Sequence, residues 1–120
     1  MPHYIDGFVI PVPKEKIDRY RSIAEQACKI WMEHGALEYR ECVGDDMETK
    51  DMVSFPQLAG AQADEVVFFS YIVYKSREHR DEVNAKVMAD PRIHELCAEG
   101  ESPFDCKRMA YGGFKAIVEA

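Results

Sequence analysis

A short segment in the last fifth of the chain contains several side chains that could bind a ligand. In PFDCKRMAYGGF (103–114), four polar side chains stand beside two glycines, namely Asp105, Lys107, Arg108 and Tyr111. A guanidinium or ammonium group favours an anionic or carbonyl-bearing ligand, and glycines let a ligand approach the backbone closely. We therefore regard this segment as a candidate binding site in which Arg108 holds negative charge. The structural alternative is that Asp105 pairs with a nearby base and the glycines accommodate a bulge.

Two histidines are candidates for moving protons. Trp31 and His34 are three residues apart, so on a helix they share one face, and a histidine titrates near neutral pH. His79, Arg80 and Asn84 line another predicted helix, where a histidine with an asparagine could orient an oxygen-bearing substrate. His34 and His79 are thus candidate general acids or bases, and Trp31 and Asn84 candidate ligand contacts. The alternatives are that Trp31 belongs to the core, that His34 caps helix carbonyls beside Gly35, and that His79 lies on solvated surface.

The cysteines and histidines do not predict a metal site. The four cysteines form no C-x-x-C motif and the four histidines no H-x-x-x-H motif, so we expect no bound metal and no cofactor. A chain of this size folds without disulfides, and we expect reduced thiols. Cys42 and Cys106 remain weak candidate nucleophiles, because a lone cysteine is most often a small buried hydrophobe.

Length and composition indicate one ordinary domain. A chain of 120 residues with 47% hydrophobic and 31% charged residues buries a substantial core, and we assign residues 1–120 to a single domain. The net charge of −7 and the lack of a basic run argue against a nucleic-acid partner. No apolar run is long enough to cross a bilayer, and the first residues do not resemble a signal peptide. We expect a cytoplasmic protein with no membrane partner.

The spacing of apolar residues divides the chain into strands and helices. Alternation is typical of a strand, and recurrence at three- and four-residue steps is typical of an amphipathic helix. The predicted elements are a strand at 3–12, a helix at 13–34, strands at 36–44 and 65–75, helices at 77–89 and 91–98, and a strand at 107–118. Pro11 and Pro13 are expected to end the first strand, Ser76 to cap the helix at 77–89, and the helix pair to end near Gly100.

Three segments carry additional information. The strand at 36–44 places Tyr39, Glu41 and Val43 on one face, which predicts that this face is buried. Residues 45–64 have no sustained period and predict a long connection with a short strand at 52–55. Gly112-Gly113 interrupts the last strand, as expected for a bulge or for the close approach of another group.

The order of the elements predicts a ferredoxin-like α+β fold. Strand, helix, strand, strand, helix, strand (βαββαβ) is the split β-α-β pattern, in which an antiparallel sheet carries its helices on one face. The first and third strands are apolar on both faces, and such an area would be abnormal on the surface of a monomer. We therefore expect a homodimer whose two sheets pack face to face.

Four long phrases of the sequence resemble a known family. DGFVIPVPK, WMEHGALEYRECVGDD, SYIVYKSREHRDEVNAKVMADPR and PFDCKRMAYGGFK together resemble the YbaA-like family of small bacterial proteins of unknown function, within the dimeric α+β barrel superfamily. The resemblance covers nearly the whole chain and implies a dimeric α+β barrel. It implies no established reaction.

In this fold the natural ligand site is the cleft between the helices and the sheet. The leading hypothesis is that the protein binds a small organic molecule there. One alternative is a cofactor-independent enzyme resembling the monooxygenases or isomerases of the superfamily, and another is a non-catalytic structural or regulatory dimer. The sequence leaves it uncertain whether the protein is an enzyme.

Overall fold

Four strands and four helices position the site. The computed structural model describes residues 2–98 and 102–120. Over these residues the strands are β1 (Tyr4–Pro13), β2 (Glu38–Val43), β3 (Glu65–Tyr74) and β4 (Ala110–Lys115). The helices are α1 (Ile17–Glu33), α2 (Phe55–Ala59), α3 (Arg77–Ala89) and α4 (Pro91–Ala98), and two short 3₁₀ turns are η1 (Lys14–Lys16) and η2 (Cys106–Arg108). The end of the helix pair near Gly100, which the sequence predicts, lies outside the described residues.

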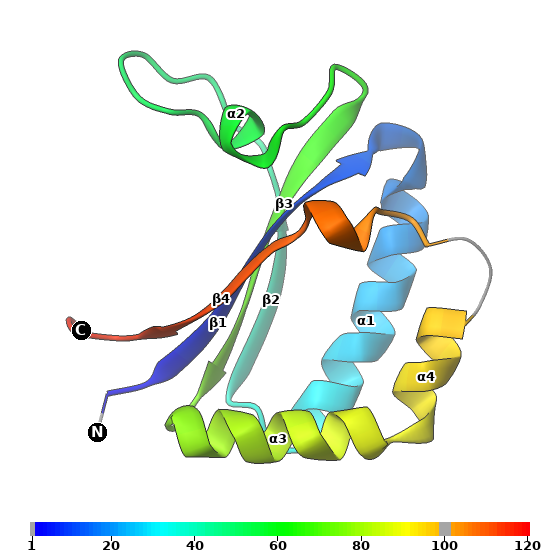
Figure 1. Cartoon of the computed structure of the whole chain (residues 1–120), viewed down its shortest axis with the longest axis vertical. Helices are drawn as coiled ribbons and strands as arrows, with labels where there is room; N and C mark the ends of the chain where they lie inside the picture. The colour runs from blue at the N-terminus through cyan, green and yellow to red at the C-terminus, as the bar shows by residue number, and fades with distance from the viewer. Residues whose placement is uncertain (1, 99–101) are drawn as a thin grey trace.

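The four strands form one antiparallel sheet in the order β2-β3-β1-β4. The predicted βαββαβ order is therefore confirmed, with the two central strands β1 and β3 hydrogen-bonded to each other over their whole length. Helices α1, α3 and α4 cover one face of the sheet (Figure 1). The cap predicted at Ser76 is also confirmed, because its hydroxyl accepts a hydrogen bond from the His79 amide at 3.1 Å.

The core lies between this helical layer and the sheet. Even-numbered residues of β1 and β3 face the helices, and Ile10, Phe68 and Tyr74 are buried there. α1 meets them with Tyr20 and Ala24 and, further along, Ala27 and Ile30, a stripe at three- and four-residue steps that its apolar pattern predicts.

Pro11 does not end β1, contrary to the prediction. The carbonyl of Val67 accepts a hydrogen bond from the Gly44 amide at 2.7 Å, on the β2 side of β3. Its partner Pro11 therefore directs its own backbone groups away from β3. Pairing of β1 with β4 ends at Val9, so the missing N–H of Pro11 costs the sheet no hydrogen bond, and the strand continues to Pro13.

The connection between β2 and β3 contains a helix where the sequence predicts a short strand at 52–55. Ser54 caps α2, its hydroxyl accepting from the Gln57 amide at 3.2 Å, and Pro56 stands in the first turn. These local signals outweigh the β-propensity of Val53 and Phe55. α2 lies on the face of the sheet opposite the other helices (Figure 1), with its Phe55 ring 6.3 Å from that of Phe69.

The glycine pair in β4 is explained by a close approach and not by a bulge. The register runs without interruption, with Gly113 opposite Asp6 and Gly112 opposite Gly7. A Cβ atom on Gly113 would lie 2.2 Å from the Tyr4 hydroxyl oxygen, so only glycine leaves room for this ring. β4 is also shorter than the predicted strand at 107–118, because η2 occupies its first residues.

Candidate functional site

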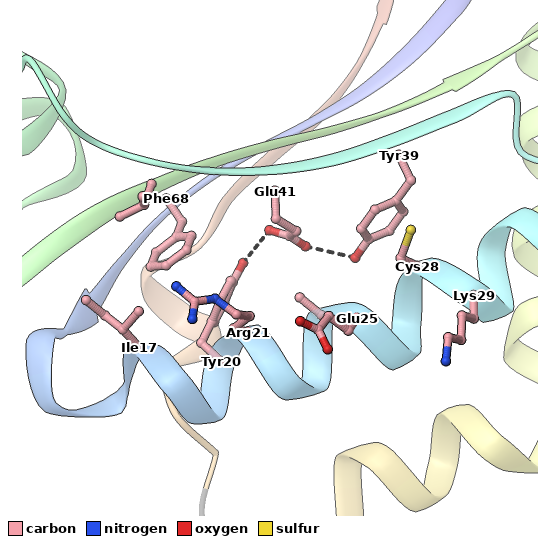
Figure 2. A pocket seen from close by; sticks show the side chains of 11 residues that line it. Ile17, Tyr20, Arg21, Glu25, Cys28, Lys29, Tyr39, Glu41 and Phe68 are labelled. Atoms are coloured by element: carbon pink, nitrogen blue, oxygen red, sulfur yellow. Dashed lines mark hydrogen bonds between the residues drawn. The ribbon is translucent and has the colours of Figure 1, made fainter.

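A carboxylate held by two tyrosines lies on the helical side of the sheet. The Tyr20 hydroxyl donates to Oε1 of Glu41 at 2.8 Å, and the Tyr39 hydroxyl donates to Oε2 at 2.8 Å. Figure 2 shows Glu41 between the two rings, with Tyr20 arriving from α1 and Tyr39 from β2. Each carboxylate oxygen thus has one neutral donor.

Strand alternation and the helical stripe bring these three groups together. Tyr39 and Glu41 are two residues apart on β2, so both side chains point toward α1. Tyr20 is a buried member of the α1 stripe and packs on Phe68, with ring centroids 4.3 Å apart. A half-buried carboxylate is therefore placed on a face that is otherwise apolar.

Two adjoining cavities meet at this group. An open depression of about 590 Å³ lies between α1 and β2, and an inner cavity of about 300 Å³ lies between α1 and the central strands. The walls of the inner cavity are mostly apolar and include Phe8, Trp31 and Ile72. Both cavities are bordered by Tyr20, Ala24, Tyr39 and Glu41. The carboxylate therefore stands where the depression enters the inner cavity.

The ionisable neighbours of Glu41 are held in their neutral forms. Burial, and then the negative charge of Glu41, raise the pKa values of the Tyr20 and Tyr39 hydroxyls far above the ordinary range of tyrosine. The same two causes raise the pKa of the Cys28 thiol in the depression. At neutral pH both tyrosines therefore remain hydrogen-bond donors, and Cys28 is not a thiolate nucleophile.

A second polar group lies around Asp6, which lines a smaller hollow next to the inner cavity. Nη1 of Arg80 on α3 donates to Oδ1 of Asp6 on β1 and to the Tyr111 hydroxyl on β4, both at 2.8 Å. The Arg80 guanidinium also lies over the Tyr4 ring, 5.0 Å from its centroid. Burial raises the pKa of the Asp6 carboxyl, although the charge of Arg80 opposes this shift. β3 lies between the strands of Asp6 and Glu41, and the two residues are offset by two positions along the sheet register. Their Cα atoms are therefore roughly 12 Å apart.

Three of the residues predicted to contact a ligand come together beside Asp6. Trp31, Asn84 and Tyr111 line a hollow of about 250 Å³ that shares part of its wall with the inner cavity. The Asn84 carbonyl oxygen accepts from Trp31 Nε1 and from the Tyr74 hydroxyl, each at 3.2 Å. The amide of Asn84 is thereby fixed in one orientation, with its position set by the core.

The remaining predicted ligand contacts lie elsewhere. Arg108 makes two 2.8 Å hydrogen bonds to the carboxylate of Glu65 and a third to the Gly60 carbonyl, so it fastens the end of the 44–64 connection to β3. Asp105 accepts from the Lys107 amide at 3.0 Å and caps η2, and the Lys107 side chain is exposed. The segment 103–114 is thus divided, with Tyr111 in one hollow and Arg108 in another.

Both histidine candidates have structural partners outside the inner cavity. Nε2 of His34 lies 2.8 Å from Oδ2 of Asp90, which joins the end of α1 to the start of α4. Nδ1 of His79 accepts from the Lys75 amide at 2.9 Å, and its ring packs edge-on against Tyr74. Neither residue borders the two cavities that meet at Glu41.

The hydrogen bonds that Asp90 accepts from Arg92 and His34 lead us to expect a loss of stability in acid. Hydrogen bonds from Arg92 and then His34 hold the pKa of the Asp90 carboxyl well below its usual range. A lowered folded-state pKa stabilises the protein above the unfolded-state value of about 3.9, and this stabilisation disappears as the pH falls below it. Urea unfolding of Asp90→Asn should therefore show a deficit at pH 7 that narrows steadily below pH 4. The exposed Asp46→Asn should follow the parent protein throughout; an Asp90→Asn deficit independent of pH would contradict the prediction.

Sequence reasoning missed Asp6, Glu41 and Tyr20 as site residues. A signal for two of them was present, because Asp6 and Glu41 each interrupt an apolar row of a predicted strand. The sequence placed Arg80 with His79 and Asn84 on one helix, but it did not predict the pairing of Arg80 with Asp6, 74 residues away. The sequence could thus indicate Asp6 on β1 and Glu41 on β2 as unusual residues, but it could not predict which side chains contact them.

The fold and the cleft define the class of protein: a small α+β protein of ferredoxin-like βαββαβ order, with a cavity between its sheet and its helices. Residues 3–106 match the family described as "Protein of unknown function (DUF1428)", and the chain belongs to that family. It is 45% identical over 117 residues to the uncharacterized protein YbaA of Escherichia coli K12 and to that of Shigella flexneri, covering 97% of this chain and 97% of each relative. The family resemblance of the four phrases is therefore confirmed.

A solved structure supports the fold class independently. The crystal structure of a nipsnap family protein of unknown function from Agrobacterium tumefaciens C58 matches with a TM-score of 0.58 and 16% identity, over 96% of this chain and 88% of that chain. At this identity the likeness concerns the fold, and it confirms the predicted α+β architecture. No helix among the described residues is long and apolar enough to span a bilayer, and within those residues no group of three or more His, Cys, Asp and Glu is arranged to hold a metal ion.

Proposed function

We propose that this protein binds a small organic molecule with an apolar body in the cleft between α1 and the sheet. The observation that carries the proposal is the inner cavity of about 300 Å³, whose walls are mostly apolar and which opens at Glu41 into the larger depression. Ligand sites are commonly apolar cavities with a few oriented polar groups, and Glu41, Tyr20 and Tyr39 are such groups.

Binding is favoured over catalysis by where the candidate acids and bases lie. His34 and His79 are engaged with Asp90 and the Lys75 amide, away from the cavities that meet at Glu41. The Cys28 thiol is kept protonated. Burial and hydrogen bonding thus support a binding protein more strongly than an enzyme that resembles a monooxygenase or an isomerase.

Filling the cavity tests this proposal. Ala27 lines only the inner of the two cavities that meet at Glu41, and Ala27→Leu adds three carbon atoms to it while keeping the helix. Thermal shift and proton NMR with neutral probes at millimolar concentration (2-phenylethanol, p-cresol, indole and benzaldehyde) should give at least one ligand that raises the Tm. Ala27→Leu should abolish this binding without lowering the Tm of the free protein.

Ala85→Leu is the matched control, because Ala85 is exposed on α3 and lines none of the cavities described above. It should bind the probes as the parent protein does. If no probe binds the parent protein in either assay, or if Ala27→Leu binds them unchanged, the proposed cavity function is wrong.

We also propose that a second copy of the chain covers the open face of the sheet. The odd-numbered residues of β1 and β3 and the even-numbered residues of β4 point to this face, and Glu65, at the first position of β3, is the charged residue among them. Its carboxylate is paired with Arg108. The edge strand β2 adds Glu38 and Arg40, which pair with each other at 3.2 Å. Phe69 and Phe114 are 44% and 61% exposed there. Because the net charge is −7, two copies repel each other over most of their surface, and this largely apolar face, whose few charges are paired, is where they can meet.

Sedimentation equilibrium tests the homodimer. At micromolar concentration the protein should have twice the chain mass of 13.8 kDa, and Phe69→Glu should reduce it to one chain. Met32→Glu is the control, since Met32 is 42% exposed on α1 in the opposite layer, and it should remain dimeric. A monomeric parent protein would contradict this proposal.

A further inference from the structure

Glu41 differs from the more deeply buried carboxylates in having no cationic partner among the residues that the structure describes. Asp6, Glu65 and Asp90 have side chains 2%, 6% and 9% exposed, and each pairs with an arginine at 2.8 Å. The ion pairs of the described residues do not include Glu41. A carboxylate on an apolar wall without a counter-charge is unfavourable, and a bound cation would relieve that cost.

The two tyrosines leave part of the carboxylate available. An ionised carboxylate has about four lone-pair sites, and the hydrogen bonds of Tyr20 and Tyr39 use one on each oxygen. Because both hydroxyls stay neutral, they orient Glu41 without cancelling its charge. They fix the carboxylate at the mouth of the inner cavity.

The surroundings of Glu41 suit a positive charge. The aromatic rings of Tyr20, Tyr39 and Phe68 border the depression (Figure 2), and aromatic faces attract cations. Two cationic residues, Arg21 and Lys29, also border the depression. Nη1 of Arg21 lies 3.7 Å from the carboxylate of Asp18, and neither cation forms an ion pair with Glu41 among the described residues. The negative potential is also felt by Cys28, whose thiol pKa is raised by burial and by the charge of Glu41.

We propose that the ligand of the cleft is a protonated amine, with its ammonium group at Glu41 and its apolar body in the inner cavity. This inference rests on the proposed function of the cleft and adds the chemical class of the ligand. The ammonium group would donate to the free lone pairs of Glu41, forming a charge-assisted hydrogen bond.

A pair of probes that differ only in charge tests the inference. 2-Phenylethylamine is protonated at pH 7 and has the shape of the neutral 2-phenylethanol. Isothermal titration calorimetry at pH 7 should show the amine binding at least about tenfold more tightly than the alcohol, the gain expected of a charge-assisted hydrogen bond. Glu41→Gln keeps the size of the side chain and should bring the two affinities to within about threefold of each other.

Glu82→Gln is the control for net charge, because Glu82 is exposed on α3 and lines none of the cavities described above. It should preserve the preference for the amine. Equal binding of both probes to the parent protein overturns the inference and leaves the cavity function standing. Binding of neither probe also overturns the inference, and it overturns the cavity function as well if p-cresol, indole and benzaldehyde fail to bind. A preference that Glu82→Gln abolishes as completely as Glu41→Gln does would reflect overall charge and would also overturn the inference.

Discussion

Replacing Asp6 with asparagine should lower the free energy of unfolding by about 3 kcal/mol. The Asp6 side chain is 2% exposed and the Arg80 side chain 13% exposed, so the substitution leaves a guanidinium group in the core without its buried counter-charge. The expected loss is at the lower end of the range for broken buried pairs, because Arg80 keeps its hydrogen bond to Asp81. Equilibrium urea unfolding, analysed with a common m-value, measures it.

Asp81→Asn is the matched control, since it removes the other carboxylate that contacts Arg80. The Asp81 side chain is 62% exposed, and exposed pairs contribute about 0–1 kcal/mol. Asp6→Asn and Asp81→Asn losses of equal size would contradict the view that Arg80 depends on a buried partner.

Removing both members of the buried pair should cost much less than removing Asp6 alone. The pKa of Asp6 is raised by burial despite the presence of Arg80, so the carboxylate gains less from its partner than it loses in hydration. The double substitution Asp6→Leu with Arg80→Met replaces both groups with apolar side chains, and such replacements are often neutral. We expect its unfolding free energy to lie closer to that of the parent protein than Asp6→Asn does.

Gly113→Ala should destabilise the protein by about 1–3 kcal/mol, the usual cost when an added side chain forces its neighbours to shift. Its Cβ atom would lie 2.2 Å from the Tyr4 hydroxyl oxygen and 2.8 Å from two ring carbons, so the Tyr4 ring or β4 has to move. The Tyr4 ring supports the Arg80 guanidinium, and the displacement would extend to the Asp6 group. Thermal and urea unfolding measure the effect.

Gly112→Ala provides the comparison at the neighbouring position. Its added Cβ would meet the Phe114 ring at 3.6 Å, an ordinary contact, and alanine restricts the unfolded chain more than glycine does. This variant should be neutral or slightly more stable than the parent protein. If both alanine variants lose the same stability, β4 is sensitive to any side chain in the glycine pair, and the close approach of Tyr4 is not the reason.

Much of the fold was predictable because its signals are local. The apolar periods of β3 and α3, the cap at Ser76 and the proline at the start of α4 each act over a few residues, and the predicted and observed bounds of α3 and α4 agree. At two places a neighbouring element decided what the sequence left wrong or open. Pro11 can remain within β1 because the pairing of β1 with β4 ends at Val9. Glycine is needed at position 113 because the Tyr4 ring lies close to it.

The candidate site shows where local reasoning ends. The sequence by itself determined the order of the elements, the fold class, the family resemblance and the presence of Asp6 and Glu41 on apolar rows. The tertiary structure alone decided that Asp6 meets Arg80, 74 residues away, and that Glu41 meets Tyr20, 21 residues away, with no cation in its ion-pairing range among the described residues. The physical reason is that the cost of a buried charge depends on what strand register and helix packing place beside it, and those partners are distant in the chain.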